Sequence, residues 1–560
     1  MSFILLLVFL FVILTRCFED RTIVLKDLTN SVEYSIKLDE KSDFWKQISK
    51  YLNNSKSEYI IEGNHNTIEI NNVSIPFQNR YSRITLRHLN LTISLVKQQV
   101  SLSGYVTFDD CYITIENCSK SFLTKNNIHL NFTNSVIKVN KLSCNLLDTN
   151  CNLILYDTTI TSSKINHIIL SNINLSISNV QIVNSSMNSI LDSNVGICNI
   201  QNLTLNRVKL FSPLFKLENC HFEAQNISLN KVLYSSKACL IDSKNMKKLK
   251  IISSNFSNTF GNDINSSVIR VVSTKSVVLQ NNYIGKQNNI WSLFEDSEFS
   301  IEKSNFSVSH CIVSSVSSKG TIEICNFENC SKLSVIDSTN STISLDRCEF
   351  VRCKAKKGSV LVAKSNSSIS MIDVNSFFCE ATEKGAVAYI EDSKLRTDMC
   401  TFKYNKAPAA PSLFLKNSNN SEIKRTESKF NNGRFTFIYA TGNMNLSINS
   451  VRIDDYYTKS VYCSENVNVQ YENAYFKCAG RCQPVWEHFT PKPKNISVIE
   501  KTEIIKPLIN YQTYRDIPIY YIILLLLVIC FLFEILYNTS WFRRRFWFRK
   551  NIKKLNFHDA

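Results

Sequence analysis

Short alternations of apolar and polar residues recur along most of the chain. Clear examples start at Thr321 (TIEICNFENCS), Thr342 (TISLDRCEFVRCK) and Ser368 (SISMIDVNSFFCEA). Each begins with a short alternating segment and continues with polar residues, an aromatic residue, and then Cys or Asn. Alternation with period 2, bounded by Asn, Ser and Asp, predicts β-strands that bury one face.

The aromatic residues of these segments recur every 21 to 28 residues. Such a period is typical of a solenoid, whereas a propeller blade needs about 40 residues. The sequence therefore predicts an all-β fold, a right-handed parallel β-helix in which each repeat is one coil. The marker positions are Phe256, Tyr283, Phe306, Phe327, Phe350, Phe378, Phe402 and Phe430.

The alternation also predicts which side chains fill the interior of a coil. Ile322 and Ile324 are expected to point inward, and one coil later Ile343 and Leu345 to stack on them at ~4.8 Å. The chain has only 11 Gly residues. We therefore expect Asn and Ser to occupy the turns, since Asn tolerates the left-handed backbone.

Cysteines stand at equivalent positions of neighbouring repeats. Cys325 and Cys348 are 23 residues apart, and so are Cys330 and Cys353. Stacked equivalents would lie within the Cα distance that a disulfide tolerates, ~4.4–6.8 Å. We predict the disulfides Cys325–Cys348 and Cys330–Cys353, with a ladder of free buried thiols as the alternative. Cys379 and Cys400 are expected on the same columns.

One segment fits a different solenoid. The apolar spacing from Ile197 through Ile200, Leu203 and Leu205 to Val208 matches a leucine-rich-repeat pattern. A leucine-rich-repeat-like solenoid is therefore the alternative fold.

Two apolar segments at the chain ends predict the compartment. Residues 3–14 have the length of a signal-peptide core, with cleavage expected after Cys17. Residues 517–537 are long enough to span a ~30 Å hydrocarbon layer, and basic residues follow them. We expect a type I plasma-membrane protein with an extracellular N-terminus. The cations expected to contact anionic inner-leaflet lipid are Arg543, Arg544, Arg545, Arg549, Lys550, Lys553 and Lys554.

These features predict the domain organisation. We expect a signal peptide (1–17), an N-terminal cap (18–84) with a short amphipathic helix near 43–52, and β-helix repeats (85–460). A Cys-containing cap (461–487), a stalk (488–516), a transmembrane helix (517–537) and a basic cytoplasmic tail (538–560) complete the chain.

Asn-x-Ser/Thr patterns agree with a secreted ectodomain. They occur at 18 positions before residue 517, and an occupied Asn must face water. The candidate sites are Asn53, Asn72, Asn90, Asn131, Asn174, Asn202, Asn305, Asn340, Asn366, Asn445 and Asn495.

Charge and motifs do not indicate an enzyme. The net charge is +17, of which the tail after the span carries a large share. The compartment, rather than the charge, excludes a nucleic-acid partner. The acidic doublets Asp109-Asp110 and Asp454-Asp455 are the candidates for paired carboxylates, and turn positions explain them more simply. We expect no catalytic residues, no cofactor and no metal.

The segments Phe327-Glu328-Asn329-Cys330, Phe350-Val351-Arg352-Cys353 and Phe402-Lys403-Tyr404-Asn405 resemble β-helix proteins of the polymorphic outer-membrane-protein type. Gly358 and Gly385 open partial matches to the GGAI element of those proteins, with Lys357 and Lys384 in place of the first Gly. The chain looks most like single-pass surface families of parasitic protists, for which adhesion or antigenic display is implied. We therefore expect a surface glycoprotein that binds a glycan or a protein, with a polysaccharide lyase or hydrolase as the alternative.

Overall fold

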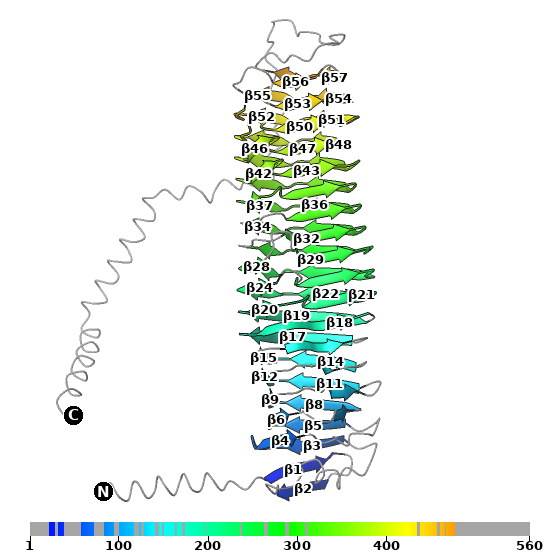
Figure 1. Ribbon diagram of the computed structural model, residues 1–560, viewed down its shortest axis with the longest axis vertical. Helices are drawn as coiled ribbons and strands as arrows, with labels where there is room; N and C mark the ends of the chain where they lie inside the picture. The colour runs from blue at the N-terminus through cyan, green and yellow to red at the C-terminus, as the bar shows by residue number, and fades with distance from the viewer. Residues whose placement is uncertain are drawn as a thin grey trace, which may run out of the picture. The chain divides into compact units, whose positions relative to one another are not determined.

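The computed structural model describes residues 22–28, 32–37, 58–71, 83–94, 100–102, 104–116, 122–124, 128–140, 145–147, 151–162, 165–170, 174–194, 196–235, 238–261, 267–285, 290–307, 312–433, 437–455, 460–464 and 466–476. Within these ranges the chain forms strands, turns and bends and no helix. Successive coils stack along one axis, as Figure 1 shows.

Each coil contributes strands to three faces, which follow one another along the chain. The first face consists of β3 (Glu58–Glu62), β5 (Arg83–Arg87), β8 (Tyr105–Asp109), β11 (Ile128–Thr133), β14 (Cys151–Tyr156), β17 (Asn174–Val183), β19 (Ile197–Asn206), β22 (His221–Gln225), β26 (Lys248–Ile252), β30 (Val277–Gln280), β33 (Glu298–Glu302), β36 (Lys319–Glu323), β40 (Thr342–Asp346), β44 (Ser368–Ile372), β48 (Lys394–Asp398), β51 (Ser421–Lys424), β54 (Met444–Asn449) and β57 (Val467–Glu472).

The second face continues from the first after one corner, and β17 and β19 extend across that corner. It consists of β4 (Thr67–Asn71), β6 (Asn90–Ser94), β9 (Tyr112–Glu116), β12 (Val136–Asn140), β15 (Thr159–Ser162), β23 (Ser228–Asn230), β27 (Asn255–Phe256), β31 (Tyr283–Ile284), β34 (Asn305–Ser307), β37 (Asn326–Glu328), β41 (Glu349–Val351), β45 (Asn375–Phe377), β49 (Thr401–Lys403), β52 (Glu427–Lys429), β55 (Arg452–Asp454) and β58 (Tyr475–Phe476).

The third face follows a second corner. It consists of β7 (Val100–Leu102), β10 (Phe122–Thr124), β13 (Asn145–Leu147), β16 (Ile165–Leu170), β18 (Ser186–Ser193), β20 (Lys209–Leu210), β21 (Phe215–Glu218), β24 (Val232–Tyr234), β25 (Ile241–Lys244), β28 (Thr259–Gly261), β29 (Ser267–Val272), β32 (Ile290–Glu295), β35 (Val313–Val316), β39 (Ile336–Thr339), β43 (Leu361–Lys364), β47 (Ala388–Glu391), β50 (Leu413–Lys416), β53 (Ile438–Thr441) and β56 (Val461–Cys463).

A further short sheet lies between the second corner and the third face. It consists of β38 (Ser331–Lys332), β42 (Lys354–Lys357) and β46 (Glu380–Lys384), and its strands pair in parallel like those of the three faces. The predicted right-handed parallel β-helix is therefore confirmed. The leucine-rich-repeat alternative is wrong, because the segment from Ile197 forms the two-face strand β19.

An antiparallel hairpin precedes the first coil. β1 (Thr22–Asp27) pairs antiparallel with both β2 (Val32–Lys37) and β3, and its Ile23 and Leu25 are fully buried. This hairpin covers the open end of the parallel stack, which otherwise exposes unpaired backbone groups.

The coils extend beyond both predicted boundaries. They already include β3 and β4, inside the expected cap of 18–84, and they continue to β58, inside the expected cap of 461–487. The residues of the predicted signal peptide, helix 43–52, stalk, span and tail lie outside the described residues. The part of the chain that is described contains no helix with the length and apolarity that a membrane crossing requires.

The corners share a two-residue arrangement. A residue in the left-handed region is followed by a buried residue, as in Arg347 (φ 51°) before Cys348. Asn, Asp and Ser often supply the first residue, which agrees with the expected substitution for Gly. The prediction that Ile324 points into the interior is wrong. Ile324 is a corner residue with φ 54°, and 42% of its surface is exposed.

Aromatic rings stack inside the second face. The ring centroids of Phe306 and Phe327 lie 4.7 Å apart, and those of Phe327 and Phe350 4.6 Å apart, with nearly parallel planes. Phe402 also lies in this column, but Tyr283, Phe378 and Phe430 do not. In those coils the column position is occupied by Ile284, Ser376 and Ser428 instead. The prediction that Tyr283, Phe378 and Phe430 are equivalent to the other aromatic residues is therefore wrong.

Serine replaces phenylalanine where buried amides fill the interior. The Asn405 side chain accepts hydrogen bonds from Ser376 Oγ and from the Cys379 backbone N–H. Two coils later, Asp455 accepts hydrogen bonds from Ser428 Oγ at 2.6 Å and from the Asn431 N–H at 2.9 Å. Burial raises the pKa of Asp455. Asp455 therefore belongs to a structural network rather than to an exposed carboxylate pair.

Two glycines permit tight turns just before strands of the third face. Gly358 (φ 49°) and Gly385 (φ 57°) lie just before β43 and β47. A Cβ at these positions would lie 2.1 Å from the Leu361 carbonyl oxygen and 2.3 Å from that of Ala388. This geometry requires Gly.

We predict opposite outcomes for two phenylalanines one coil apart. Phe350→Ala should lower the free energy of unfolding by about 3–5 kcal/mol, because it leaves a cavity in the ring column. Phe378→Ala should cost about 1 kcal/mol or less, since that ring is 53% exposed. Urea unfolding of the purified protein checks this, and equal losses would contradict the assignment of Phe378 to the surface.

Candidate ligand-binding surface

The four cysteines of the predicted disulfides stack as expected but remain free thiols. Cys325 contacts Cys348, and Cys353 contacts both Cys330 and Cys379. All are buried and unpaired, so the predicted bonds Cys325–Cys348 and Cys330–Cys353 are absent. The alternative, a buried thiol ladder, describes the structure. Cys463 is disulfide-bonded.

Hydrogen bonds to backbone carbonyls explain why free cysteines occupy these corner positions. Cys348 Sγ donates to the carbonyl oxygens of Ile322, one coil earlier, and Asp346, both at 3.4 Å. Ser135 Oγ makes the equivalent pair of bonds at the same corner of an earlier coil. Cysteine thus replaces serine as a corner donor. Burial raises the pKa of Cys400, in the column of Cys348, to about 12.

The described candidate glycosylation sites lie at corners or within strands. Asn202, Asn340 and Asn366 are left-handed corner residues, and Asn90, Asn131, Asn174, Asn305 and Asn445 lie in strands. The Asn-x-Ser/Thr pattern arises where an asparagine occupies the left-handed corner position, the next residue is buried, and the following strand begins with Ser or Thr. Asn340, Ser341 and Thr342 are an example. The fold itself therefore generates many of the sequence matches. Asn53, Asn72, Asn495 and the basic tail residues lie outside the described residues.

Exposed aromatic rings form a ladder at the second corner. Phe378, Tyr404 and Phe430 each have left-handed backbone, with φ between 57° and 58°. Neighbouring ring centroids lie 4.9 Å and 5.2 Å apart. The residues are 53%, 46% and 37% exposed. Because stacked rings expose their edges, the ladder presents an apolar strip along the axis.

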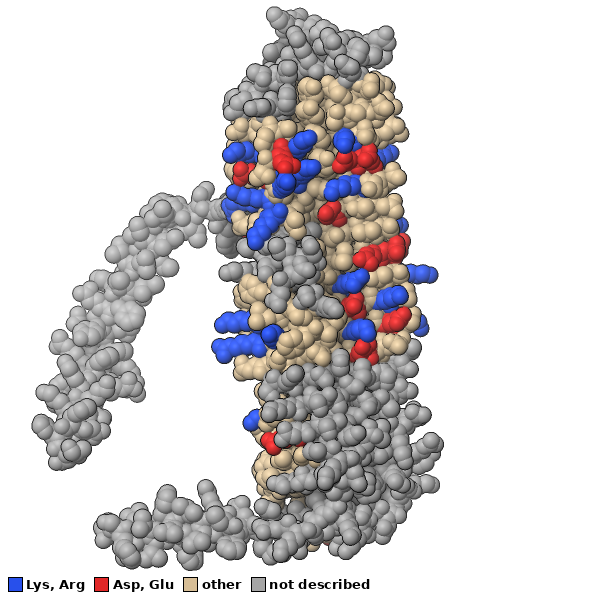
Figure 2. Space-filling view, in the orientation of Figure 1, with Lys and Arg blue, Asp and Glu red and all other residues tan. Residues whose placement is uncertain are grey.

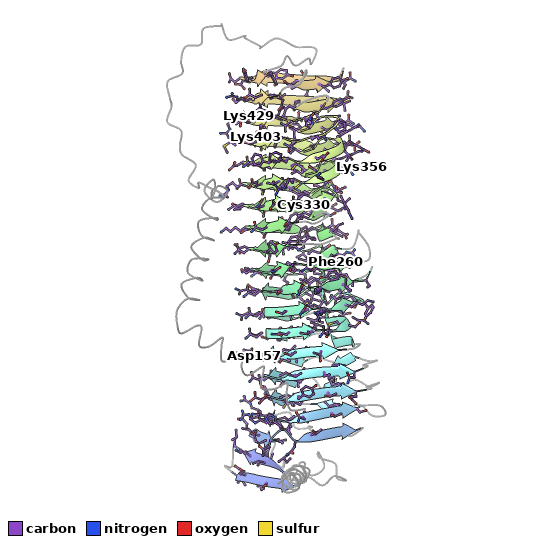
Figure 3. The ribbon with its side chains drawn as sticks, turned by 90° about the vertical axis from the view of Figure 1, so that its left-hand side faces the viewer. Asp157, Phe260, Cys330, Lys356, Lys403 and Lys429 are labelled. Atoms are coloured by element: carbon purple, nitrogen blue, oxygen red, sulfur yellow. The ribbon has the colours of Figure 1, made fainter. Side chains whose placement is uncertain are left out.

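Lysines line both sides of this aromatic ladder. On one side Lys403 and Lys429 stack in register on β49 and β52, as Figure 3 shows. On the other side Lys354, Glu380 and Lys406 are in register across the short sheet. Figure 2 shows basic side chains gathered on the side of the molecule where Figure 1 places β42 and β46.

The short sheet and its continuation at residue 406 carry more cations than anions. We call this region the lysine patch. Six lysines and two glutamates give it a net charge of +4. Its charged residues are Lys332, Lys354, Lys356, Lys357, Glu380, Glu383, Lys384 and Lys406.

Each glutamate of the lysine patch is shared between two lysines. Glu380 lies 3.1 Å from Lys354 Nζ and 3.6 Å from Lys406 Nζ. The hydrogen bond from Lys354 and the nearby positive charge lower the pKa of Glu380. Glu383 lies 3.1 Å from Lys356 Nζ. The lysines therefore keep unneutralised charge.

Two lysines of the patch are direct neighbours. Lys357 and Lys384 are in register on β42 and β46. Like charges in register destabilise a sheet. Their ammonium groups instead lie over aromatic rings, Lys357 over Tyr389 at 4.9 Å and Lys384 over Phe414 at 4.7 Å. The underlying rings Tyr389, Phe414 and Tyr439 are stacked in turn.

Charges on the first face are paired more evenly. Arg425 contacts Asp398 at 2.6 Å and Lys250 contacts Glu223 at 3.2 Å. Lys319 lies 3.8 Å from Glu298. These pairs join neighbouring coils, and exposed pairs of this kind contribute little to stability.

A polar hollow of about 470 Å³ lies on the first face near its C-terminal end. Lys394, Arg396, Glu422 and the sequon residue Asn445 line it. It is shallow and open, and it is formed by strands β48, β51, β54 and β57.

The acidic doublets do not form a carboxylate pair. Burial alone would raise the pKa of Asp109, but hydrogen bonds from Thr133 and Arg87 outweigh it and lower the pKa. Asp110 lies 3.3 Å from His88. Across the described ranges, no three His, Cys, Asp or Glu side chains are arranged to hold a metal ion.

Comparison with known proteins identifies no family for this chain. No protein-family model matches the sequence, and no curated protein matches it. Among solved structures, the A-module of mannuronan C-5 epimerase AlgE6 from Azotobacter vinelandii is similar, with 10% identity over 66% of this chain and 90% of that one. The TM-score is 0.22, so the similarity carries no argument about activity.

We predict that the stacked thiols are protected but dispensable. Because they are buried, Cys325, Cys348, Cys330 and Cys353 should react with a maleimide only after unfolding. Cys348→Ser should cost about 1 kcal/mol, since serine makes the same hydrogen bonds. Removing a disulfide would cost about 2–5 kcal/mol. A Cys325–Cys348 cross-link in non-reducing peptide maps would contradict the free-thiol structure.

Proposed function

We propose that the protein is a non-enzymatic surface glycoprotein that binds ligands along the side of its β-helix. The span at 517–537 anchors it in the plasma membrane, with the coils outside the cell. A solenoid presents a long lateral surface, which suits the binding of an extended partner.

The exposed aromatic ladder is the observation that carries this proposal. Stacked rings inside the second face stabilise the fold, but Phe378, Tyr404 and Phe430 lie outside that face and remain 53%, 46% and 37% exposed. Exposed aromatic residues beside cations are typical of binding surfaces. Three successive coils maintain this arrangement.

The alternative function, polysaccharide cleavage, needs a pair of available carboxylates. In the described residues Asp455 is bonded inside the column and Asp109 is bonded to Thr133 and Arg87. Neither doublet supplies a free pair. Release of reducing ends or unsaturated products from polysaccharides by the purified protein would favour the enzyme.

We predict that the aromatic ladder is required for attachment. Cells displaying the full-length protein should stain with antibody before permeabilisation and attach to a target surface. Replacement of Phe378, Tyr404 and Phe430 by Ser should reduce attachment roughly tenfold or more, since exposed aromatic contacts often dominate binding.

The matched control replaces three other exposed aromatics, Tyr105, Tyr112 and Tyr156, by Ser. It should attach like the natural protein at equal surface staining. Equal loss in both variants, or staining only after permeabilisation, would contradict the proposed function.

Glycan occupancy provides a separate test of the compartment. We predict modification at Asn366 and Asn305, which are exposed, and none at Asn131, whose side-chain oxygen is buried. Mass spectrometry of deglycosylated peptides measures this. An unmodified protein from a secreting cell would contradict the extracellular location.

A further inference from the structure

We propose that the lysine patch binds a linear acidic polysaccharide laid parallel to the β-helix axis. This inference rests on the proposed function and specifies its ligand. The patch comprises the short sheet and Lys406, beside the aromatic ladder.

Charge is the first argument. The patch has a net charge of +4 within a few coils, whereas on the first face cations and carboxylates are paired between coils. The side chains of Lys354, Lys356 and Lys406 are 62%, 75% and 65% exposed. They can therefore turn toward a ligand. Release of counterions from a polyanion favours its binding to such a cluster.

Spacing is the second argument. Equivalent positions of neighbouring coils recur at ~4.8 Å along the axis. Lys357 and Lys384 occupy consecutive positions of this kind in direct register, and Glu383, which also pairs with Lys356, lies 4.0 Å from Lys357 Nζ. A polymer with one acidic group per sugar can place anions along such a row. Its binding would relieve the repulsion between the two lysines.

The aromatic ladder favours a polysaccharide over an acidic polypeptide. Its ring edges form a continuous apolar strip beside the lysines, which the C–H surfaces of successive sugars can cover. The backbone groups of the short sheet pair with neighbouring coils, so an added peptide strand finds no sheet edge along the patch.

The experiment measures binding of the purified full-length protein to immobilised heparin and polygalacturonate, with dextran and polyglutamate for comparison. The patch variant carries Lys→Gln at 354, 356, 357, 384 and 406. The control variant carries Lys→Gln at 248, 250, 319, 416 and 424, which lie in ion pairs on other faces. Each variant lowers the net charge by five.

We expect the patch variant to lose at least about tenfold in affinity for both acidic polysaccharides, with a weaker salt dependence. The control should stay within about threefold. Conversely, Glu380→Gln with Glu383→Gln should tighten binding, a gain that misfolding cannot produce. Unchanged melting temperatures verify that the variants fold.

Equal losses in the patch and control variants would overturn the inference, because binding would then depend on total charge alone. Stronger binding of polyglutamate than of the polysaccharides would overturn it in favour of an acidic polypeptide. If attachment needs the aromatic ladder but not the lysines, the proposed function stands and this inference fails. If polysaccharide binding needs the lysines but cells show no attachment, the proposed function fails and the polysaccharide-binding site stands.

Discussion

The parallel hydrogen-bond register between coils is the constraint on which this structure depends. Each coil donates and accepts backbone bonds with its neighbours on every face, so the same position of each repeat lies above its equivalent. Left-handed corner residues make this possible, because they turn the chain within two residues and direct the next side chain inward. An inward-facing residue must therefore pack against the equivalent residues of the coils before and after it.

Because equivalent positions of neighbouring coils are stacked, residues of one kind at those positions form ladders along the axis. Inside the column, phenylalanine rings stack at about van der Waals separation, and cysteine, serine and threonine exchange at one corner because all donate to the same carbonyls. Outside it, the same repetition aligns Phe378 with Tyr404 and Lys357 with Lys384. A surface of repeated chemistry thus follows from the same geometry that builds the core.

The predictions from the sequence that proved wrong concern residues at corners rather than residues in strands. Strand alternation correctly placed Ile322, Ile343 and Leu345 inside. The prediction is wrong for Phe378 and Phe430 because each lies two positions after the residue in register with the column, which is Ser376 or Ser428. A corner interrupts the alternation, so the side that a residue faces cannot be counted across it. Cysteine spacing predicted the stack but not the bonding, since nearby carbonyls compete for the thiols.

The sequence by itself determined the period, the parallel coil and most inward positions, because burial of alternate residues leaves a direct imprint on the order of apolar and polar residues. It also placed cysteines on common columns. Only the tertiary structure decided which aromatics lie outside and that lysines from residues 332, 354–357, 384 and 406 share one surface. Those outcomes depend on where each corner falls and on which coil lies next, and neither is encoded in any single segment.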